Sequence, residues 1–229
     1  MHQLIDKKRL TIYSFFFLFL SSINNVSLIK YKDNLTILKY IEVKGLNENL
    51  NFKVKKKLEY LLNTNIYEIN KKNIKKELEK YNYIEKYKVT KFYPSKLLFQ
   101  LKQAKFIATT LKNNKKYIIG SNGKLIDYNI VNLEKDLPNV FGNFKIKDFI
   151  LLNEVLKKTN FEFKNIKDIF FFPSGRWDIK TKNNLTVKLP KKNINKAINK
   201  LNLIIQSDEL NKYNVIDLRI VNQVILSNE

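Results

Sequence analysis

Residues 87–101, YKVTKFYPSKLLFQL, predict two short strands joined by a turn. Apolar and polar residues alternate over residues 87–91 and again over residues 97–101, which is typical of strands with one buried face. Between them, Tyr93-Pro94-Ser95-Lys96 has the composition of a turn. We therefore expect a hairpin here, and the neighbouring elements can be placed around it.

One strand and two helices are expected before this hairpin. Residues 41–43 indicate a short strand, closed by Gly45. The two helices would begin near Asn51 and Asn70, because asparagine often caps helix N-termini. Their apolar residues recur at helical spacing, and these are Val54, Leu58, Leu61 and Leu62, then Ile74, Leu78 and Tyr81. The order β-α-α-β-β predicts a three-stranded sheet with both helices on one face.

A second unit, rich in strands, is expected from about Phe106 onwards. Apolar residues at helical spacing predict helices over residues 147–158 and 194–205. A two-residue turn at Asn183-Asn184 would join two strands. Strands are expected at residues 117–119, 125–126, 166–172, 176–180, 185–189, 215–220 and 224–226, the last two being separate or one bent strand. The predicted fold class is α+β.

The N-terminal part of the chain predicts a membrane anchor. Residues 10–29, LTIYSFFFLFLSSINNVSLI, carry no charge and follow Lys7-Lys8-Arg9. At about 1.5 Å per residue, a helix of this length covers a hydrocarbon core of about 30 Å. We expect residues 1–9 to form a cytoplasmic tail, residues 10–29 a transmembrane helix and residues 30–37 a linker. The long remainder would be translocated, giving a single-pass type II protein.

Two alternatives compete with the anchor. A cleavable signal peptide has the same order of basic and apolar regions, although residues 21–25, SSINN, offer no small-x-small cleavage site. A buried helix of a soluble protein is the other alternative. The polar pair Asn24-Asn25 weakens the membrane-spanning interpretation, since polar side chains are costly in hydrocarbon.

Composition argues against catalytic and nucleic-acid functions. The chain has no cysteine, and its one histidine is His2, so His-based metal sites and catalytic triads are excluded. No enzyme motif is recognisable, and we expect neither catalysis nor a cofactor. The net charge of +22 comes mostly from lysines spread over nearly every segment. Such lysines are typical of solvated faces, so nucleic acid is not expected as a ligand. We also expect no small-molecule substrate.

Six motifs in order resemble the bacterial cell-division protein family FtsQ, also called DivIB. They lie at residues 41–45 (IEVKG), 84–101, 117–123, 137–142, 176–189 and 215–219 (VIDLR). The chain departs from the family pattern at residues 103–108, where the family has Glu-Arg before Pro-x-Ala. It also has Gly120 or Ser121 in place of an aspartate, and Pro190 in place of a glycine. These departures affect local turns.

The resemblance implies a POTRA domain at residues 38–106 and an FtsQ/DivIB-type β domain at residues 107–229. It implies a non-catalytic divisome scaffold that links early cytoplasmic ring proteins to late septal peptidoglycan-synthesis proteins. The implied partners are FtsB and FtsL, bound in the periplasm, together with other divisome members. The implied location is the cell inner membrane at the division septum.

The resemblance places the partner contact on the last strand, after Asp-Leu-Arg. The corresponding residues here are Ile220, Val221, Asn222, Gln223, Val224, Ile225 and Leu226. The family usually has tyrosine at the position of Ile220, so the resemblance carries over the strand and not that side chain. A terminal strand is often an edge strand, which a partner can extend through backbone hydrogen bonds. Alternatively, Val224, Ile225 and Leu226 complete the chain's own core.

Arg176, Trp177 and Arg219 are further candidates. Only three of the 43 basic residues are arginine, so the two late arginines indicate sites that need a planar, bidentate donor. Each could bind a partner carboxylate, or form an internal salt bridge such as Arg219 with Asp178 or Asp217. Trp177 could be a core residue or a contact residue.

A second functional class remains open from the sequence. A protein with a POTRA domain could instead belong to outer-membrane protein assembly or secretion. Such proteins normally carry repeated POTRA units and a β-barrel with strands of about ten residues. The sequence shows one β-α-α-β-β unit, which favours the division scaffold.

Overall fold

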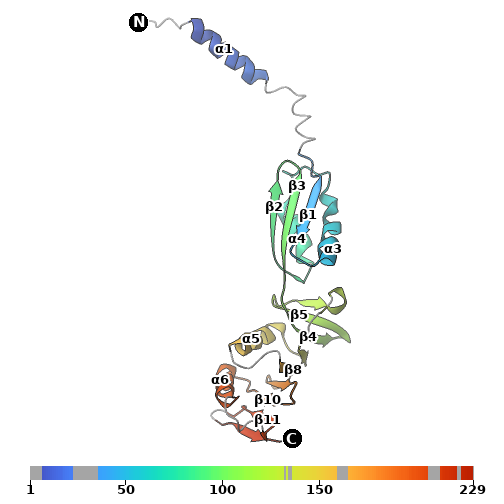
Figure 1. The fold of residues 1–229 in the computed structure, drawn as a ribbon, viewed down its shortest axis with the longest axis vertical. Helices are drawn as coiled ribbons and strands as arrows, with labels where there is room; N and C mark the ends of the chain where they lie inside the picture. The colour runs from blue at the N-terminus through green and yellow to red at the C-terminus, as the bar shows by residue number, and fades with distance from the viewer. Residues whose placement is uncertain are drawn as a thin grey trace, which may run out of the picture. The chain divides into compact units, whose positions relative to one another are not determined.

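The computed structural model of the 229-residue chain contains two compact units. The structure describes residues 7–22, 36–131, 133, 136–158, 165–205, 212–220 and 223–228. One unit comprises Met1–Lys80 with Lys86–Gln103, and the other comprises Tyr81–Glu85 with Ala104–Glu229. Each unit contains its own sheet, of three strands in the first and nine in the second. Figure 1 shows the elements in chain order.

The N-terminal helix α1 runs over Lys7–Ser22. It contains the first part of the expected anchor, and residues 23–29 of that segment lie outside the described residues. Where the structure describes the chain, it contains no helix with both the length and the apolar character needed to cross a membrane. None of the α1 residues is buried. Its exposed large apolar side chains are Leu10, Ile12, Tyr13, Phe15, Phe16, Phe17, Leu18, Phe19 and Leu20.

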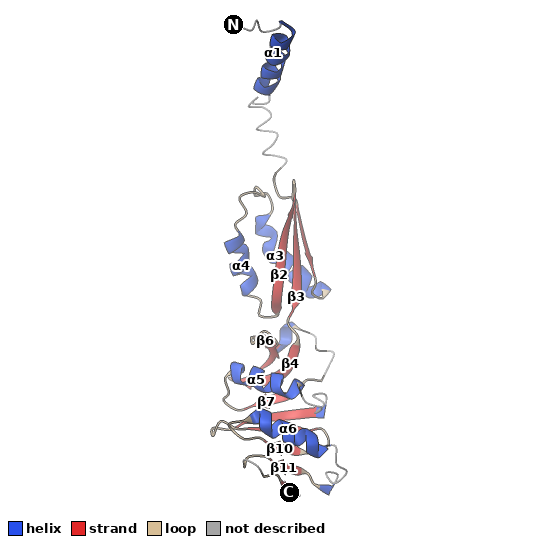
Figure 2. Cartoon of the chain, turned by 90° about the vertical axis from the view of Figure 1, so that its left-hand side faces the viewer, coloured by secondary structure: helices blue, strands red, loops and turns tan. Residues whose placement is uncertain are grey.

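The first unit has the predicted order β-α-α-β-β. Its elements are β1 (Tyr40–Lys44), α3 (Glu48–Leu58), the short 3-10 helix η1 (Glu59–Leu61), α4 (Lys71–Glu79), β2 (Ile84–Phe92) and β3 (Lys96–Gln103). The strand order is β1-β3-β2, and β1 is parallel to β3 with Val43 opposite Phe99. Figure 2 shows both α3 and α4 on one face of this sheet, as the sequence predicted.

The helix starts of the first unit are set by asparagine side chains. Asn70 caps α4, since its side chain accepts a hydrogen bond from the Lys72 backbone N–H at 2.8 Å, as predicted. The predicted cap of α3 at Asn51 is wrong, because Asn47 accepts the bond from the Leu50 N–H. Asn51 instead donates to the Leu46 carbonyl and accepts from the Leu46 N–H. It therefore holds the loop that enters the helix.

The core of the first unit joins the inner face of the sheet to one stripe on each helix. Alternate residues of β1 and β3 face inward, as the period of a strand requires. Fully or almost fully buried residues are Ile41, Leu50, Val54, Leu58, Ile74, Leu78, Leu97, Phe99 and Leu101. Each large apolar side chain removed from water contributes about 1.5–3 kcal/mol before entropy losses. This core explains why the hairpin and the two helices fold together.

The second unit contains the following elements in order. They are β4 (Phe106–Lys112), β5 (Lys115–Gly120), β6 (Leu125–Asp127), η2 (Tyr128–Ile130), β7 (Asn139–Phe141), α5 (Ile146–Lys157), β8 (Ile166–Phe171), β9 (Trp177–Thr181), β10 (Thr186–Lys188), α6 (Ile194–Ile205), β11 (Val215–Asp217) and β12 (Ile225–Ser227). The sheet order is β12-β11-β10-β9-β8-β7-β4-β5-β6. Strands β4 and β7 were not predicted, whereas both helices were.

The core of the second unit lies between the sheet and its two helices. Phe149, Leu152 and Leu156 of α5 and Ile198 and Leu201 of α6 belong to one buried cluster with residues of the strands. Figures 1 and 2 agree that α5 and α6 lie on the same side of the sheet. The opposite face is therefore where polar and charged residues of these strands can reach solvent.

We expect Gly142→Ala to lower the free energy of unfolding of the second unit by about 2 kcal/mol or more. Gly142 has φ +107°, and a Cβ there would lie 2.2 Å from the Phe171 carbonyl oxygen. The side chain would therefore force apart two stretches of backbone. Urea unfolding followed by circular dichroism measures the loss.

The matched control is Gly123→Ala in the same unit. Gly123 also has a positive φ, of +72°, but a Cβ there has no atom within 4 Å. Only the backbone strain remains, worth about 1 kcal/mol. If both variants lost the same free energy of unfolding, the close approach of residue 142 to the Phe171 carbonyl oxygen would not be the cause of the loss in Gly142→Ala.

Candidate partner-binding surface

Four strands at one end of the second sheet align a row of side chains across the sheet. In the antiparallel pair β9–β10, Asp178 is opposite Lys188. In the parallel pair β10–β11, Lys188 is opposite Asp217. In the antiparallel pair β11–β12, Asp217 is opposite Ile225. We call Asp178, Lys188, Asp217 and Ile225 the cross-strand row.

The neighbouring residues form a second row that faces the core. Ile179, Val187, Ile216 and Leu226 are opposite one another on the same four strands. Ile179, Val187 and Ile216 are completely buried, and Leu226 packs against the same cluster. Because successive side chains of a strand point to opposite faces, the cross-strand row lies on the face away from α5 and α6.

β12 is the outermost strand at this end of the sheet. It pairs with β11 on one side, and no described strand pairs with its other side. Its outward backbone groups are therefore the kind that a further strand can bind. Three-residue β12 is shorter than the predicted contact segment of residues 220–226.

The seven predicted contact residues differ in their surroundings. Ile220 and Ile225 are exposed by 52% and 46%, and Gln223 is also exposed. Val224 and Leu226 are partly buried against the core. Val221 and Asn222 lie outside the described residues. The two alternatives drawn from the sequence thus apply to different side chains, with Val224 and Leu226 packing inward and Ile225 facing outward.

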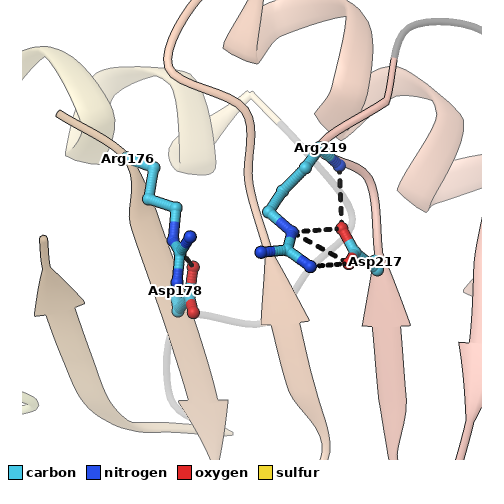
Figure 3. A network of polar contacts seen from close by, with 4 residues as sticks. All are labelled: Arg176, Asp178, Asp217 and Arg219. Atoms are coloured by element: carbon cyan, nitrogen blue, oxygen red, sulfur yellow. Dashed lines mark hydrogen bonds and ion pairs between the residues drawn. The ribbon is translucent and has the colours of Figure 1, made fainter. Parts of the chain in front are cut away.

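Arg219 lies against Asp217, which is one of the two acidic residues considered from the sequence. Its Nε donates to both Asp217 carboxylate oxygens at 2.8 and 2.9 Å, and its Nη2 also donates to Oδ2. The Arg219 backbone N–H donates to Oδ1 at 3.0 Å. Figure 3 shows this arrangement, in which one carboxylate accepts both backbone and side-chain hydrogens. The Arg219 side chain stays 41% exposed.

Arg176 and Asp178 form a looser ion pair on the neighbouring part of the sheet. The Arg176 Nε and Asp178 Oδ1 atoms are 3.6 Å apart, too far for a hydrogen bond, and both are buried (Figure 3). The Arg176 guanidinium also lies 4.3 Å from the centroid of the Phe172 ring, within range of a cation–π contact. Arg176 therefore covers an apolar ring as well as a carboxylate.

The two carboxylates of the row respond differently to this environment. Burial raises the pKa of Asp178 above its usual value, and the nearby Arg176, Arg219 and Lys188 offset this only in part. Burial acts the same way on Asp217, but hydrogen bonds from the Arg219 side chain and backbone hold the pKa of Asp217 below its usual value. The difference arises because Asp217 accepts direct bonds and Asp178 does not.

Trp177 belongs to an aromatic cluster in the core. It is 3% exposed, and its ring centroid lies 4.7, 5.6 and 6.2 Å from those of Phe171, Phe144 and Phe149. These tilted contacts are typical of buried aromatic pairs. Because its neighbours Arg176 and Asp178 point to the other face, Trp177 fixes the strand that carries them.

Lys188 was not singled out from the sequence. Its position became significant only through the pairing of β10 with both β9 and β11, which are remote from each other along the chain. No cluster of potential metal ligands occurs in the described ranges of the chain. What the surface offers is a strand edge, an exposed isoleucine and alternating charges, all suited to non-covalent binding of another chain.

We expect Asp217→Asn to lower the free energy of unfolding by about 1 kcal/mol near pH 7. The folded-state pKa of Asp217 is depressed, so its stabilisation is present above the unfolded-state pKa and is lost as pH falls through the folded-state pKa. The difference in unfolding free energy between the variant and the wild type should therefore shrink as the pH falls below about 4. Urea unfolding at a series of pH values measures it.

Asp178→Asn is the matched control for this profile. The raised pKa of Asp178 means that its charged form opposes folding above that pKa. The variant should be at least as stable as the wild type near pH 7, and its advantage should disappear on acidification. A parallel pH dependence in the two variants would contradict the different roles assigned to the two carboxylates.

Comparison with known proteins gives two family matches that together cover most of the chain. The model described as cell division protein FtsQ/DivIB, C-terminal, matches residues 108–219. The model described as POTRA domain, FtsQ-type, matches residues 37–102. No curated protein matches the chain in sequence.

One solved structure with partial similarity is the major extracytoplasmic domain of the trans isomer of the bacterial cell division protein DivIB from Geobacillus stearothermophilus. The match has 15% identity and a TM-score of 0.33, and it covers 44% of this chain and 87% of that one. The assignment therefore rests on the two family models, which occur in the order that the sequence motifs predicted. The chain belongs to the FtsQ/DivIB family of cell-division proteins.

Proposed function

We propose that this chain is a membrane-anchored scaffold of the bacterial division septum, which binds FtsB- and FtsL-type proteins at β12. Family membership implies a non-enzymatic scaffold role in cell division. The single observation that supports β12 as the binding site is its position as the last strand of the sheet, with one side unpaired among the described strands.

In this proposal a partner segment pairs with β12 as an additional strand. Backbone hydrogen bonds supply affinity, and side chains on the outer face supply specificity. Ile225 lies on that face and is exposed, so it can pack against an apolar partner residue. Val224 and Leu226 face inward and hold β12 on the core, so the edge is rigid before the partner arrives. A preformed edge reduces the entropy lost on binding.

The charged residues beside β12 determine which charged side chains of a partner can pair with this edge. Arg219 keeps 41% of its side chain exposed while it is bound to Asp217, and it lies next to the start of the contact segment. A carboxylate of the partner could bind the same Arg219 guanidinium group, whose orientation is already fixed by its hydrogen bonds to Asp217. This gives Arg219 both an internal and an interfacial role, which the sequence left as alternatives.

Residues 10–29 are proposed as the anchor that keeps the scaffold in the inner membrane. The described part of this segment, in α1, exposes nine large apolar side chains, which is unfavourable in water and favourable in lipid. Lys7, Lys8 and Arg9 at the start of α1 favour a cytoplasmic N-terminus. The two folded units would then face the periplasm, between early cytoplasmic ring proteins and late wall-synthesis proteins.

We expect Ile225→Lys to weaken binding of the extracytoplasmic segment of FtsB from the same cell by about tenfold or more, since burial of an isoleucine contributes about 1.5–3 kcal/mol. Lysine opposite Asp217 adds no like-charge repulsion, so the fold should persist. Affinity is measured by surface plasmon resonance with the detergent-solubilised chain, and folding by circular dichroism.

The matched control is Leu111→Lys on β4, since Leu111 is also an exposed apolar residue of the same sheet. It should bind FtsB as the wild type does. Removal of residues 220–229 should abolish binding as well, but it also removes Val224 and Leu226 from the core, so the point variant is the cleaner test. Unchanged affinity in a folded Ile225→Lys protein would refute strand addition at β12.

A further inference from the structure

Exposed aromatic side chains gather at one end of the first unit. Residues 36–103 contain seven exposed aromatic side chains, and four of them surround the turn between β2 and β3. These four, which we call the aromatic end, are 48–64% exposed, and they are Tyr40, Tyr67, Phe92 and Tyr93. Single exposed aromatic residues are common, whereas a group of them indicates a surface that contacts an apolar phase or a partner.

Backbone and ring contacts bring the aromatic end together from three segments of the chain. The Tyr40 N–H donates to the Ser95 carbonyl oxygen at 3.1 Å, so the start of β1 lies against the turn. The Tyr67 and Tyr93 rings stack with their centroids 5.0 Å apart. Phe92 directly precedes Tyr93 at the end of β2. The four rings therefore belong to one preformed surface.

Lysines accompany the rings at this end. Lys39 is exposed and directly precedes β1, and the Lys96 Nζ atom lies 5.9 Å from the centroid of the Phe92 ring. Lys71-Lys72, at the start of α4, line a groove that Tyr93 also lines. The three segments that form this end, residues 36–44, 65–72 and 91–97, carry six lysines and two acidic residues. The aromatic end therefore has a net positive surrounding.

The aromatic end is also where the chain enters the first unit. The Thr36 carbonyl oxygen accepts a hydrogen bond from the Ile66 N–H at 2.9 Å, next to Tyr67. Thr36 is seven residues after Ile29, the last residue of the proposed anchor. Seven residues span at most about 25 Å even when fully extended. A bilayer that holds the anchor is therefore within reach of these side chains.

We propose that the aromatic end contacts the surface of the anionic bilayer that holds the anchor. The four rings lie at the boundary between head groups and acyl chains, where aromatic side chains are favoured. The surrounding lysines bind lipid phosphates. This inference rests on the proposed anchoring of residues 10–29. Because the anchor keeps the surface at a high effective concentration, a weak contact is sufficient.

The membrane contact is separate from partner binding at β12. It lies in the first unit, whereas β12 lies in the second. It orients the first unit relative to the bilayer, which the chain connection alone leaves free. Substitutions at the aromatic end should therefore leave the affinity for FtsB in detergent unchanged.

The test uses the full chain in lipid nanodiscs that contain phosphatidylglycerol, with a tryptophan introduced at the aromatic end. Trp177 is the chain's one native tryptophan and is buried in the second unit, so its emission gives the baseline. Tyr93→Trp and Tyr40→Trp are measured separately, and circular dichroism checks that each variant folds. Lipids brominated near the head group should lower the added emission about twofold or more in both variants.

Phe52→Trp is the matched control for position. Phe52 is an exposed aromatic residue of the same unit, but it lies near the start of α3, which follows the far end of β1. Its added emission should not respond to the brominated lipids.

A pair of charge variants tests the lysines in the Tyr93→Trp background. Lys39→Gln with Lys72→Gln should shift the equilibrium between the bound and released forms about tenfold towards release. Lys53→Gln with Lys56→Gln on α3 removes the same charge away from the aromatic end and should change this equilibrium by less than about twofold.

The outcomes separate this inference from the proposed anchor. A chain that does not co-elute with the nanodiscs would refute the anchor and the membrane contact together. A chain that co-elutes, but in which Tyr93→Trp and Tyr40→Trp are quenched no more than Phe52→Trp, would overturn the membrane contact alone. Equal quenching in nanodiscs of phosphatidylcholine only, or equal effects of the two lysine pairs, would overturn the binding of lipid phosphates.

Discussion

The register between β10 and β11 is the constraint on which the end of the second sheet depends. These two strands are separated by α6 along the chain, and their parallel pairing places Val187 beside Ile216 and Lys188 beside Asp217. Because side chains alternate between faces, a shift by one residue would move the apolar row to the outer face and the charged row into the core. Burial of Ile179, Val187 and Ile216 therefore fixes the position of Ile225 as well.

Alternating charge supports the same register on the outer face. Asp178, Lys188 and Asp217 are opposite one another on three adjacent strands, so each carboxylate has a cation on the neighbouring strand. The hydrogen bonds from Arg219 add to this at Asp217. Asp178 lacks such bonds and is more buried, which is why the two carboxylates titrate in opposite directions from the ordinary value. The row thus combines a well-bonded carboxylate near the edge with a less favourable one farther in.

The sequence predicted those parts of the fold in which local patterns are sufficient. The helical spacing in α4, α5 and α6 depends on a few neighbouring residues, and all three helices were found. A turn also occurs at Asn183-Asn184, but the connection between β9 and β10 spans residues 182–185 and is longer than the predicted two residues. β7 was missed because three residues carry too little periodicity, and it is a strand only because β4 and β8 flank it. Asn47 lies three residues before Leu50, and Asn51 lies three residues before Val54, so the sequence could not show which of them caps α3. The cross-strand row could not be predicted from the sequence, because it depends on pairing between strands that are far apart along the chain. The outer strands follow from sheet order once the strands are placed, and they are β1 and β2 in the first unit and β12 and β6 in the second.

Residue-resolved hydrogen exchange of the full chain, with and without the extracytoplasmic segment of FtsB, tests the β12 proposal most directly. Strand addition at β12 should slow exchange of amides in Ile225–Ser227 that point away from β11, and leave the amides of Leu125–Asp127 in β6, at the other end of the same sheet, unchanged. Protection that appears at β6, or that is absent from β12 while FtsB is bound, would contradict it.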